Sequence, residues 1–575
     1  MPKRTYSSEL LIYSPGKLDD EWVNKLVDGY VDDSAVVPAM AVLRFRDPGH
    51  DLLSKTSIKV GAPLRLFAKT ADEQTRVQLF FGEVTALEAE IDGTGAFTTV
   101  RALDHSHRLF RGRRVAAYRN MTASDIVRQV ARRAGVPTGR IDSTRAVYKQ
   151  VAQSNTTDWD FLRRLAQEND TVLLVDDGKL SFRRTTPASG APGVTTPPEQ
   201  SPKVLGFGDN LLSLRAVVTS VGQVKQVRVR AWDVQKKQAL VGRAQTDSSE
   251  ELQLGMTPAQ LARPFGPAEL LVTDVPYATQ AEVDSAAKAL AADVTGSFAE
   301  VEAVVQDAPH LCAGTPVTFA KVGAPFAGKY TITRAHHAFG SKDGYLTQIT
   351  VSGGQDRSLY GLAAGSSAPA HSARQTGLVI ATVTDAKDPE QKGRVKLAFP
   401  WLAPDYESDW ARTVQLGGVR GGGVFSPEVG DEVLVGFEQG YLDRPYVIGG
   451  LYNGKDKPSK HQVPLVDSTS GKVNRRSLVS RGGHRLELLD PVRGTKGVRL
   501  LTGDGKVEIK LDQQDTSVVV RSDGTVEIKA ARQINITGRG VTIDAGVGRV
   551  TLTGASVAIN GRSAVLINGA IVKIN

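Results

Sequence analysis

The histidine pairs of this chain come closest to the spacing of a metal site. His105 and His107 stand two positions apart, and His336 and His337 are adjacent. Tetrahedral zinc sites need three or four ligands, and neither pair has a third ligand at a recognisable spacing. We therefore expect structural histidines and no bound metal. The single cysteine, Cys312, also excludes an intrachain disulfide framework and a Cys-based zinc site.

Catalytic and phosphate-binding motifs are not recognisable either. The run Gly417–Gly423 is rich in glycine, but it lacks the Gly-Lys-Ser/Thr ending of a phosphate loop. It also falls between predicted strands, which favours a structural bend. The 62 acidic residues provide many carboxylate pairs, none of them in a recognisable cleft motif. We expect no catalytic residues and no cofactor.

Length and composition predict a folded chain of several units. Its 575 residues correspond to about four units, and 41% hydrophobic with 23% charged residues excludes wholesale disorder. No window holds about 18 consecutive apolar residues, so no membrane-spanning helix is expected. The start of the chain has no sustained apolar stretch. We therefore expect assembly in the cytoplasm without a cleaved signal peptide.

The C-terminal segment differs in composition from the rest. Tyr452 is the last aromatic residue, and Pro491 is the last proline. Residues 475–575 hold 16 Lys and Arg against 9 Asp and Glu, so most of the net charge of +9 lies there. The segment is rich in Val and Ile, which argues against disorder. Without aromatic residues it cannot form a conventional packed globule.

Short alternating motifs follow one another through this segment every 7 to 11 residues. Alternation of β-branched and polar residues predicts strands with one buried face, and the glycines between them predict tight corners. Two copies are nearly identical, Asp504–Lys510 and Asp523–Lys529. The predicted strands lie at 507–510, 518–520, 526–529, 534–537, 541–544, 550–553, 557–560, 565–568 and 572–575.

Repeat length indicates how these strands assemble. Each repeat supplies one strand and one corner, whereas a one-chain β-helix uses about 20 residues or more per coil. We therefore predict an intertwined trimeric β-helix, or β-prism, in which each of three chains supplies one wall per level. A β-sandwich of short strands is the alternative, although its core would be unusual without an aromatic residue.

Two regions precede this segment. Strands predicted at 377–383, 393–399, 411–416, 431–437 and 445–449 fit a small OB-type barrel over 377–458. A linker at 362–376 separates the barrel from an α+β N-terminal region, 1–361, with internal subdomains. A connector at 459–480 leads to the segment of predicted β-prism strands at 481–575.

The N-terminal region contains recognisable helix starts among its strands. We predict helices that begin at Thr122, at Thr157 and, with a Thr279–Glu282 capping box, at Thr279. Among the predicted strands is 329–336, and a proline-rich stretch at 185–202 predicts a long surface loop.

This order of parts resembles the VgrG-type hub–spike proteins of contractile injection systems, namely type VI secretion systems, phage-tail-like particles and contractile phages. Val100–Leu109 and Asp158–Ala166 resemble phage tail-hub (late control) proteins. Pro427–Val435 with Gly449–Tyr452 resembles the OB domain at the spike base, and Gly482–Asp490 resembles the entry into the spike β-helix. These stretches span nearly the whole chain in the order of the family.

The resemblance implies a mainly β fold, with an α+β hub that contains β-barrel domains, an OB-fold collar and a trimeric β-helix needle. It implies a homotrimer that joins baseplate and inner-tube proteins to a membrane-piercing tip and contacts the target membrane transiently. The resemblance leaves open whether the particle is released, delivered to a target cell or anchored to a membrane, and which effectors it carries.

The end of the spike is the expected partner-binding site. A prism leaves unpaired strand edges at its end, and in the family a conical PAAR-repeat protein covers them. The residues expected to bind this cap are Ile567, Asn568, Ile571, Val572, Lys573, Ile574 and Asn575.

Two other functions remain alternatives. A tailspike-like polysaccharide-degrading enzyme would need carboxylates beside aromatic sugar platforms, which the needle does not have. The interval Asn453–Ser480 is too short for the lysozyme domain of some phage spikes, and the chain stops within the strand repeat, so we expect no enzyme. The basic charge allows binding to an anionic surface. Sequence-specific nucleic-acid binding is not expected without aromatic residues for base stacking.

Overall fold

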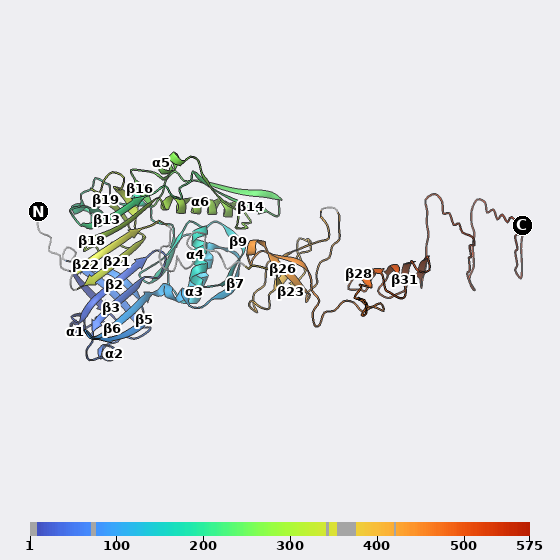
Figure 1. Ribbon diagram of the computed structural model, residues 1–575, viewed down its shortest axis with the longest axis horizontal. Coiled ribbons are helices and arrows are strands. Elements are labelled where there is room, and N and C mark those ends of the chain that lie inside the picture. Colours follow the sequence, from blue (N-terminus) through green and yellow to red (C-terminus); the bar gives the residue numbers. More distant parts are fainter. Residues whose placement is uncertain (1–7, 71–75, 341–343, 354–374, 419–420, 575) are drawn as a thin grey trace. The chain divides into compact units, whose positions relative to one another are not determined.

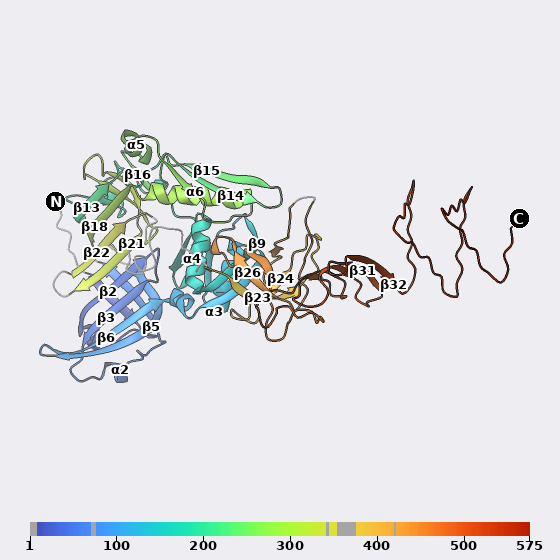
Figure 2. The same ribbon diagram turned by 45° about the vertical axis from the view of Figure 1, so that its right-hand side comes forward.

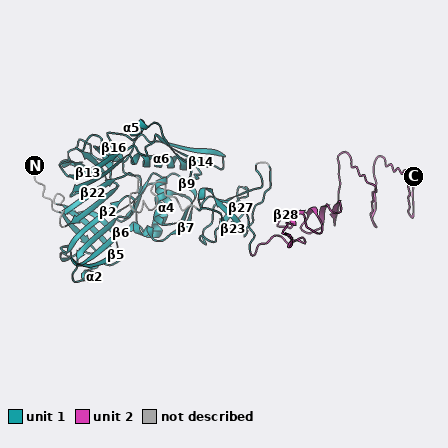
Figure 3. Cartoon of the chain, viewed as in Figure 1, with its two compact units in different colours: residues 1–453 teal, residues 454–575 magenta. Residues whose placement is uncertain are grey.

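The computed structural model describes residues 8–70, 76–340, 344–353, 375–418 and 421–574. The chain divides into two compact units, Met1–Asn453 and Gly454–Asn575 (Figure 3). Within the described ranges no helix combines the length and the apolar character that a membrane span requires.

A ten-stranded antiparallel sheet is the largest element of the first unit (Figure 1). It joins two distant parts of the chain where β2 pairs with β21, so that Tyr30 lies opposite Ala338. Its apolar face packs around fully buried Leu43, Phe45 and Leu64. The strand order is β1 (Ser8–Tyr13), β4 (Pro63–Thr70), β5 (Val77–Asp92), β6 (Gly95–Asp104), β3 (Met40–Arg46), β2 (Leu26–Ser34), β21 (Arg334–Gly340), β22 (Gly344–Val351), β18 (Ala299–Gln306) and β13 (Leu211–Val218). The short helices α1 (Asp20–Val23) and α2 (Leu52–Lys55) contribute Trp22 and Leu52 to the same core.

Two of the predicted helices form a second core with a β-ribbon. Thr122 caps α3, because its side chain accepts a hydrogen bond from the backbone N–H of Asp125. Thr157 caps α4 in the same way by accepting from the backbone N–H of Asp160. Both predicted helix starts are confirmed, and α3 ends at Gly135, which adopts a φ of 67°. The elements are α3 (Ala123–Ala134), α4 (Asp158–Glu168), the ribbon β7 (Arg114–Thr122) with β9 (Val147–Thr156), and the sheet β10 (Val172–Asp176), β11 (Lys179–Arg183) and β8 (Thr138–Ile141).

The third helix packs on a small sheet of its own. Figure 2 shows this helix beside the strands of the sheet. Val227 and Val229 of the sheet share a buried core with Val283 and Ala287 of the helix. The elements are α6 (Gln280–Gly296), β14 (Gln226–Asp233), β15 (Gln238–Gln245) and β17 (Glu269–Val272). Nearby in sequence are α5 (Pro258–Ala262) and a four-stranded sheet made of β12 (Val204–Gly206), β19 (Pro316–Ala320), β20 (Gly328–Thr331) and β16 (Leu252–Leu254).

The capping box predicted at the start of α6 forms only in part. Thr279 accepts a hydrogen bond from the backbone N–H of Glu282, but the Glu282 carboxylate accepts from Ala278 N–H instead of Thr279 N–H. The complete capping box of this region joins Thr257 and Gln260 at the start of α5.

Two further predictions were wrong in detail. The strand predicted at 329–336 is divided between β20 and β21, because the chain passes there from the small sheet to the ten-stranded one. The stretch 185–202 is not a simple surface loop, since Ala188 is fully buried and the carbonyl of Pro192 accepts a hydrogen bond from Thr318. It contains two short 3₁₀ turns, Ala188–Gly190 and Pro198–Gln200.

The five strands predicted for the OB domain are all present, some of them shorter. They are β23 (Val379–Asp385), β24 (Lys396–Ala398), β25 (Arg412–Thr413), β26 (Glu432–Phe437) and β27 (Pro445–Gly450), in the order β24-β23-β26-β27-β25. The glycine-rich run lies between β25 and β26, where Gly417 and Gly422 approach so closely that a Cβ on either would clash with the other. This supports a structural bend. The predicted linker at 362–376 lies outside the described residues, apart from Gln375 and Thr376.

The OB domain shares a core with the β-ribbon of the hub. Ala152 of β9, with Val115 and Ala117 of β7, packs among the buried aliphatic residues of the barrel. Arg119 of the ribbon donates hydrogen bonds to the backbone carbonyls of Glu407 and Ser408. Hub and barrel are therefore joined by packing as well as by the chain.

The loop of the OB domain that follows β23 is held by one carboxylate, which generates a stability prediction. Asp388 accepts hydrogen bonds from the backbone N–H groups of Glu390, Lys392 and Arg394 and from the Arg394 guanidinium. The Arg394 hydrogen bonds hold the pKa of Asp388 well below its usual range. We expect Asp388→Asn to lower the free energy of unfolding by about 2 kcal/mol at pH 7.

The expected effect depends on pH. The stabilisation from a carboxylate with a depressed pKa is present above its unfolded value and is lost as the pH falls toward its folded value. The difference between wild type and Asp388→Asn in urea unfolding should therefore begin to shrink near pH 4 and keep shrinking as the pH is lowered further. Asp405→Asn, at an exposed carboxylate of the same domain, is the control. An equal loss in both variants would contradict the assignment.

Candidate functional site: the C-terminal spike

The spike begins with a five-stranded antiparallel sheet that one chain makes alone (Figure 1). Its strands follow one another in sequence order: β28 (Arg475–Val479), β29 (Arg485–Leu489), β30 (Gly497–Leu501), β31 (Val507–Asp512) and β32 (Ser517–Ser522). The last two confirm the strands predicted at 507–510 and 518–520. The sheet starts at Arg475, inside the range predicted as a connector.

One face of this sheet is an exposed row of aliphatic side chains, here called the apolar wall. The pairing register places one residue of each strand side by side across the sheet. These residues are Leu478, Leu486, Leu500, Ile509 and Val520, whose exposed fractions lie between 38% and 55%. Leu488, Val498, Leu511 and Val518 form a second row on the same face. Contiguous apolar surface of this kind is unfavourable in water and indicates a contact with another polypeptide.

The opposite face is closed by charged groups of the same chain. The Glu487 side chain is fully buried and lies 3.1 Å from Nε2 of His461. The backbone N–H of Val463 donates to Nδ1 of His461, so the ring proton at Nε2 is free to be donated to Glu487. Arg499 donates to Glu508 at 2.5 Å. The charged groups of this face therefore have partners within one chain, whereas the side chains of the apolar wall stay exposed. Nothing in the sequence around His461 indicated its pairing with Glu487.

Beyond Ser522 the described residues form no strand, although the alternating motifs continue. The isoleucines at their centres are 64% to 71% exposed, namely Ile528, Ile536, Ile543, Ile559 and Ile567. Strands that pair only with other chains have no partner in a single chain, so the predicted prism stays a prediction over this stretch.

The residues predicted to bind a cap are extended and exposed. Ile567, Ile571, Val572 and Ile574 have exposed fractions of 64%, 78%, 50% and 88%, and Asn568 and Lys573 are exposed as well. Asn575 lies outside the described residues. A single chain does not gather these side chains into a site.

The first histidine pair has structural contacts. His107 lies 2.9 Å from a carboxylate oxygen of Glu83, which also accepts hydrogen bonds from Arg108. Desolvation acts to raise the pKa of Glu83, but the hydrogen bonds from Arg108 and His107 lower it to about 2. His105 packs edge-on against Phe81, and burial lowers its pKa.

The second histidine pair lies on β21. His336 packs against Tyr30, while His337 is buried and its Nδ1 lies 2.7 Å from the hydroxyl of Tyr345. Burial lowers the pKa of His337 to about 3, so the ring is neutral at pH 7. Across the described part of the chain, no three His, Cys, Asp or Glu side chains are grouped to hold a metal ion.

Comparison with known proteins links the barrel to a family. Residues 379–452 match the type VI secretion system/phage-baseplate injector OB domain, and residues 67–340 match the Alg8 N-terminal domain. The chain is 42% identical over 88 residues to the type VI secretion system spike protein VgrG5 of Pseudomonas aeruginosa, which is 14% of this chain and 11% of that protein. It is also 32% identical over 108 residues to the spike protein VgrG1c of the same organism, which is 18% of this chain and 15% of that protein. The matched segments are thus a small part of these relatives.

Solved structures extend the likeness to the fold of most of the chain. A chain of the lidless PdpA–VgrG complex superimposes with a TM-score of 0.51 and 9% identity, over 90% of this chain and 98% of that one. A chain of the lidded Francisella PdpA–VgrG complex superimposes with a TM-score of 0.50 and 10% identity, over 90% of this chain and 80% of that one. The sequence matches thus make this protein a relative of the VgrG-type spike proteins, and most of the chain has the fold of a chain of the PdpA–VgrG complexes.

Proposed function

We propose that this chain is the central hub and spike of a contractile injection machine and works as a homotrimer. The apolar wall carries the proposal. Five strands of one chain present a continuous aliphatic face, while the charges of the other face are paired internally. Three such sheets with their walls turned toward a common axis would bury these side chains and leave the charged faces in water.

The same arrangement accounts for the stretch after Ser522. Its aliphatic side chains and its backbone groups both need partners, and an intertwined prism supplies both from the other two chains. A closed three-walled prism has no lateral sheet edge, and its hydrogen-bond ladders resist axial load. These are the properties that a needle driven through an envelope requires.

The first unit would seat the needle in the machine. The core that the β-ribbon shares with the OB domain gives the spike base a rigid attachment to the hub. We infer that the hub binds inner-tube and baseplate proteins and that the particle assembles in the cytoplasm, to be released or delivered to a target cell. The solved PdpA–VgrG complexes support binding of a further protein. A PAAR-repeat protein would cap the end of the needle.

Oligomeric state tests the proposal directly. Light scattering of the purified chain should give three times 61.5 kDa, and a stable monomer would contradict the proposal. Leu500→Asp with Ile509→Asp places carboxylates within the apolar wall, so this double variant should lose the trimer because buried unpaired charges are strongly unfavourable. Gln513→Asp, in the exposed turn between β31 and β32, adds a carboxylate outside the wall and should leave the trimer intact.

Deletion of residues 571–575 tests the cap. Many levels of prism remain below the deletion, so the trimer should persist, while capture of a PAAR-repeat protein in a pull-down should be lost because the strand edges that would pair with it are removed. Tight binding of the cap by the truncated trimer would show that these residues are not the docking site.

Absence of catalysis is the remaining expectation. We propose that the chain is not an enzyme, because the interval 453–480 cannot hold a lysozyme domain and the spike has no aromatic residue to bind a sugar. The purified trimer should clear neither peptidoglycan nor capsular polysaccharide in a zymogram, with lysozyme as the positive control. Clearing that survives repurification would overturn this expectation.

A further inference from the structure

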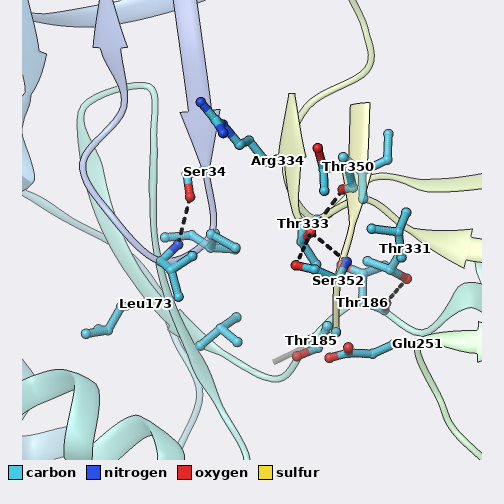
Figure 4. Close-up of a pocket in the computed structure, with 18 of the residues that line it drawn as sticks. Ser34, Leu173, Thr185, Thr186, Glu251, Thr331, Thr333, Arg334, Thr350 and Ser352 are labelled. Carbon is cyan, nitrogen blue, oxygen red and sulfur yellow. Dashed lines mark hydrogen bonds between the residues drawn. The ribbon is translucent and has the colours of Figure 1, made fainter. Parts of the chain in front are cut away.

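Helix α6 lies between a cavity of the first unit and the small sheet on which it packs. The cavity has a volume of about 690 Å³, and its lining includes Asp293 of α6 and Glu251. Figure 4 shows Thr331 in the wall of this cavity, where its hydroxyl donates a hydrogen bond to the backbone carbonyl of Thr186. One side of α6 is therefore turned toward this cavity and the other toward the sheet.

The small sheet, in the order β15-β14-β17, presents its inner face to α6. Val227 and Val229 of β14 are fully buried there. The helix approaches so closely that a Cβ at Gly242 of β15 would lie 2.4 Å from the carbonyl oxygen of Val283. Because successive side chains of a strand alternate between its two faces, this contact determines which residues point the other way.

The outer face of the sheet points away from α6 and is here called the arginine face. Figures 1 and 2 show α6 on one side of the β14–β15 hairpin, and the arginine face lies on the other. Trp232 and Leu271 of this face are 51% and 49% exposed, so the described residues leave much of it in water. Its central residues are Arg228, Arg230 and Trp232 of β14, Val241 and Arg243 of β15, and Leu271 of β17.

The arginines of this face outnumber its carboxylates. Glu269 of β17 forms an ion pair with Arg228. Arg243 lies directly opposite Arg228 across the strand pair, and like charges in that position are unfavourable. Arg230 and Arg243 are exposed, and neither belongs to an ion pair within the described residues. Two arginines are therefore left without a counter-charge on a face that already carries a repulsive pair.

Trp232 gives one end of the arginine face an apolar surface. The pairing register places it opposite Ala239, and Val241 is the next residue of β15 on the same face. An aromatic ring left half in water beside other apolar groups is unfavourable and typical of a contact site. Tryptophan and arginine are also the residues that most often dominate the binding energy of protein interfaces.

The hairpin turn beyond Trp232 adds positive charge at the same end. Lys236 and Lys237 are exposed there. The carboxylate of Asp233 accepts hydrogen bonds from the backbone N–H groups of Gln235 and Lys236, so it is engaged in holding the turn. The electrostatic potential over this end of the sheet is therefore positive and attracts acidic partners.

We propose that the arginine face docks an acidic segment of a partner protein. Carboxylates of that segment would pair with Arg230 and Arg243, and an apolar side chain would cover Trp232. The unpaired positive charge favours an acidic occupant. The aliphatic residues Val241 and Leu271 favour a polypeptide over single-stranded nucleic acid, which binds through several stacking rings where this face has one. This docking goes beyond the proposed function and needs neither the trimer nor the cap.

A short peptide that alternates glutamate with leucine is the probe, and the full-length protein is the receptor. Binding should shift the tryptophan emission of wild type to shorter wavelength because the peptide covers an exposed indole, and Trp232→Phe should abolish the shift. In calorimetry the affinity should fall at least about tenfold in the double variant Arg230→Glu with Arg243→Glu. Added salt should weaken binding to wild type.

The matched control is Arg113→Glu with Arg145→Glu, which makes the same change in net charge at exposed arginines elsewhere in the first unit. It should bind the peptide as wild type does. An equal loss in both double variants would show attraction to overall charge alone and would overturn the proposal. So would a peptide that does not bind, or tighter binding of a thymidine oligonucleotide or of phosphatidylglycerol vesicles, since the face would then serve a nucleic acid or a membrane.

Thermal stability of the free protein gives a second readout. Arg243→Gln removes one of the two opposed arginines, so this variant should be at least as stable as wild type while its affinity for the peptide falls. A lower melting temperature for Arg243→Gln would show that Arg243 has a structural role within the sheet, and its assignment to partner binding would be wrong.

Discussion

The aliphatic side chains of the spike impose the main constraint on this molecule, because one chain leaves them in water. In the sheet β28–β32 the backbone is already paired and only the apolar wall needs cover. After Ser522 the backbone groups also need partners. The groups that lack a partner within the chain therefore increase along the spike, from side chains alone to the whole strand.

The first unit differs from the spike, because its apolar side chains are buried by other residues of the same chain. Each of its parts has a core of fully buried side chains, and the β-ribbon places Ala152 in the core of the OB domain. In the proposed trimer, this unit would be a rigid base for a needle whose own order comes from association. This difference between the two units follows from their composition, because all of the aromatic residues lie in the first.

Local features of the structure could be predicted from the sequence, and features that join distant segments could not. Thr122 and Thr157 mark helix starts because a cap and a hydrophobic stripe are both local, and the OB strands follow from alternation. The break between β20 and β21 could not be predicted, since it depends on a strand 300 residues earlier. Glu251 and Asp293 carry no motif, and only the fold brings them to one cavity. The pairing of His461 with Glu487 could not be predicted either, because it also depends on the fold and not on a local motif.

The pairing of β2 with β21 also affects how the chain is made. Asp32 and Arg334, whose side chains form an ion pair between these two strands, are 302 positions apart. At ribosomal rates of about 5 to 20 residues per second the β2 edge therefore waits about 15 to 60 s for its partner. During that time an unpaired strand edge is open to the same strand of a neighbouring nascent chain. Translation of several copies from one messenger would then bring exposed edges together, so spacing between ribosomes, or a chaperone on β2, becomes a condition for correct closure of the hub.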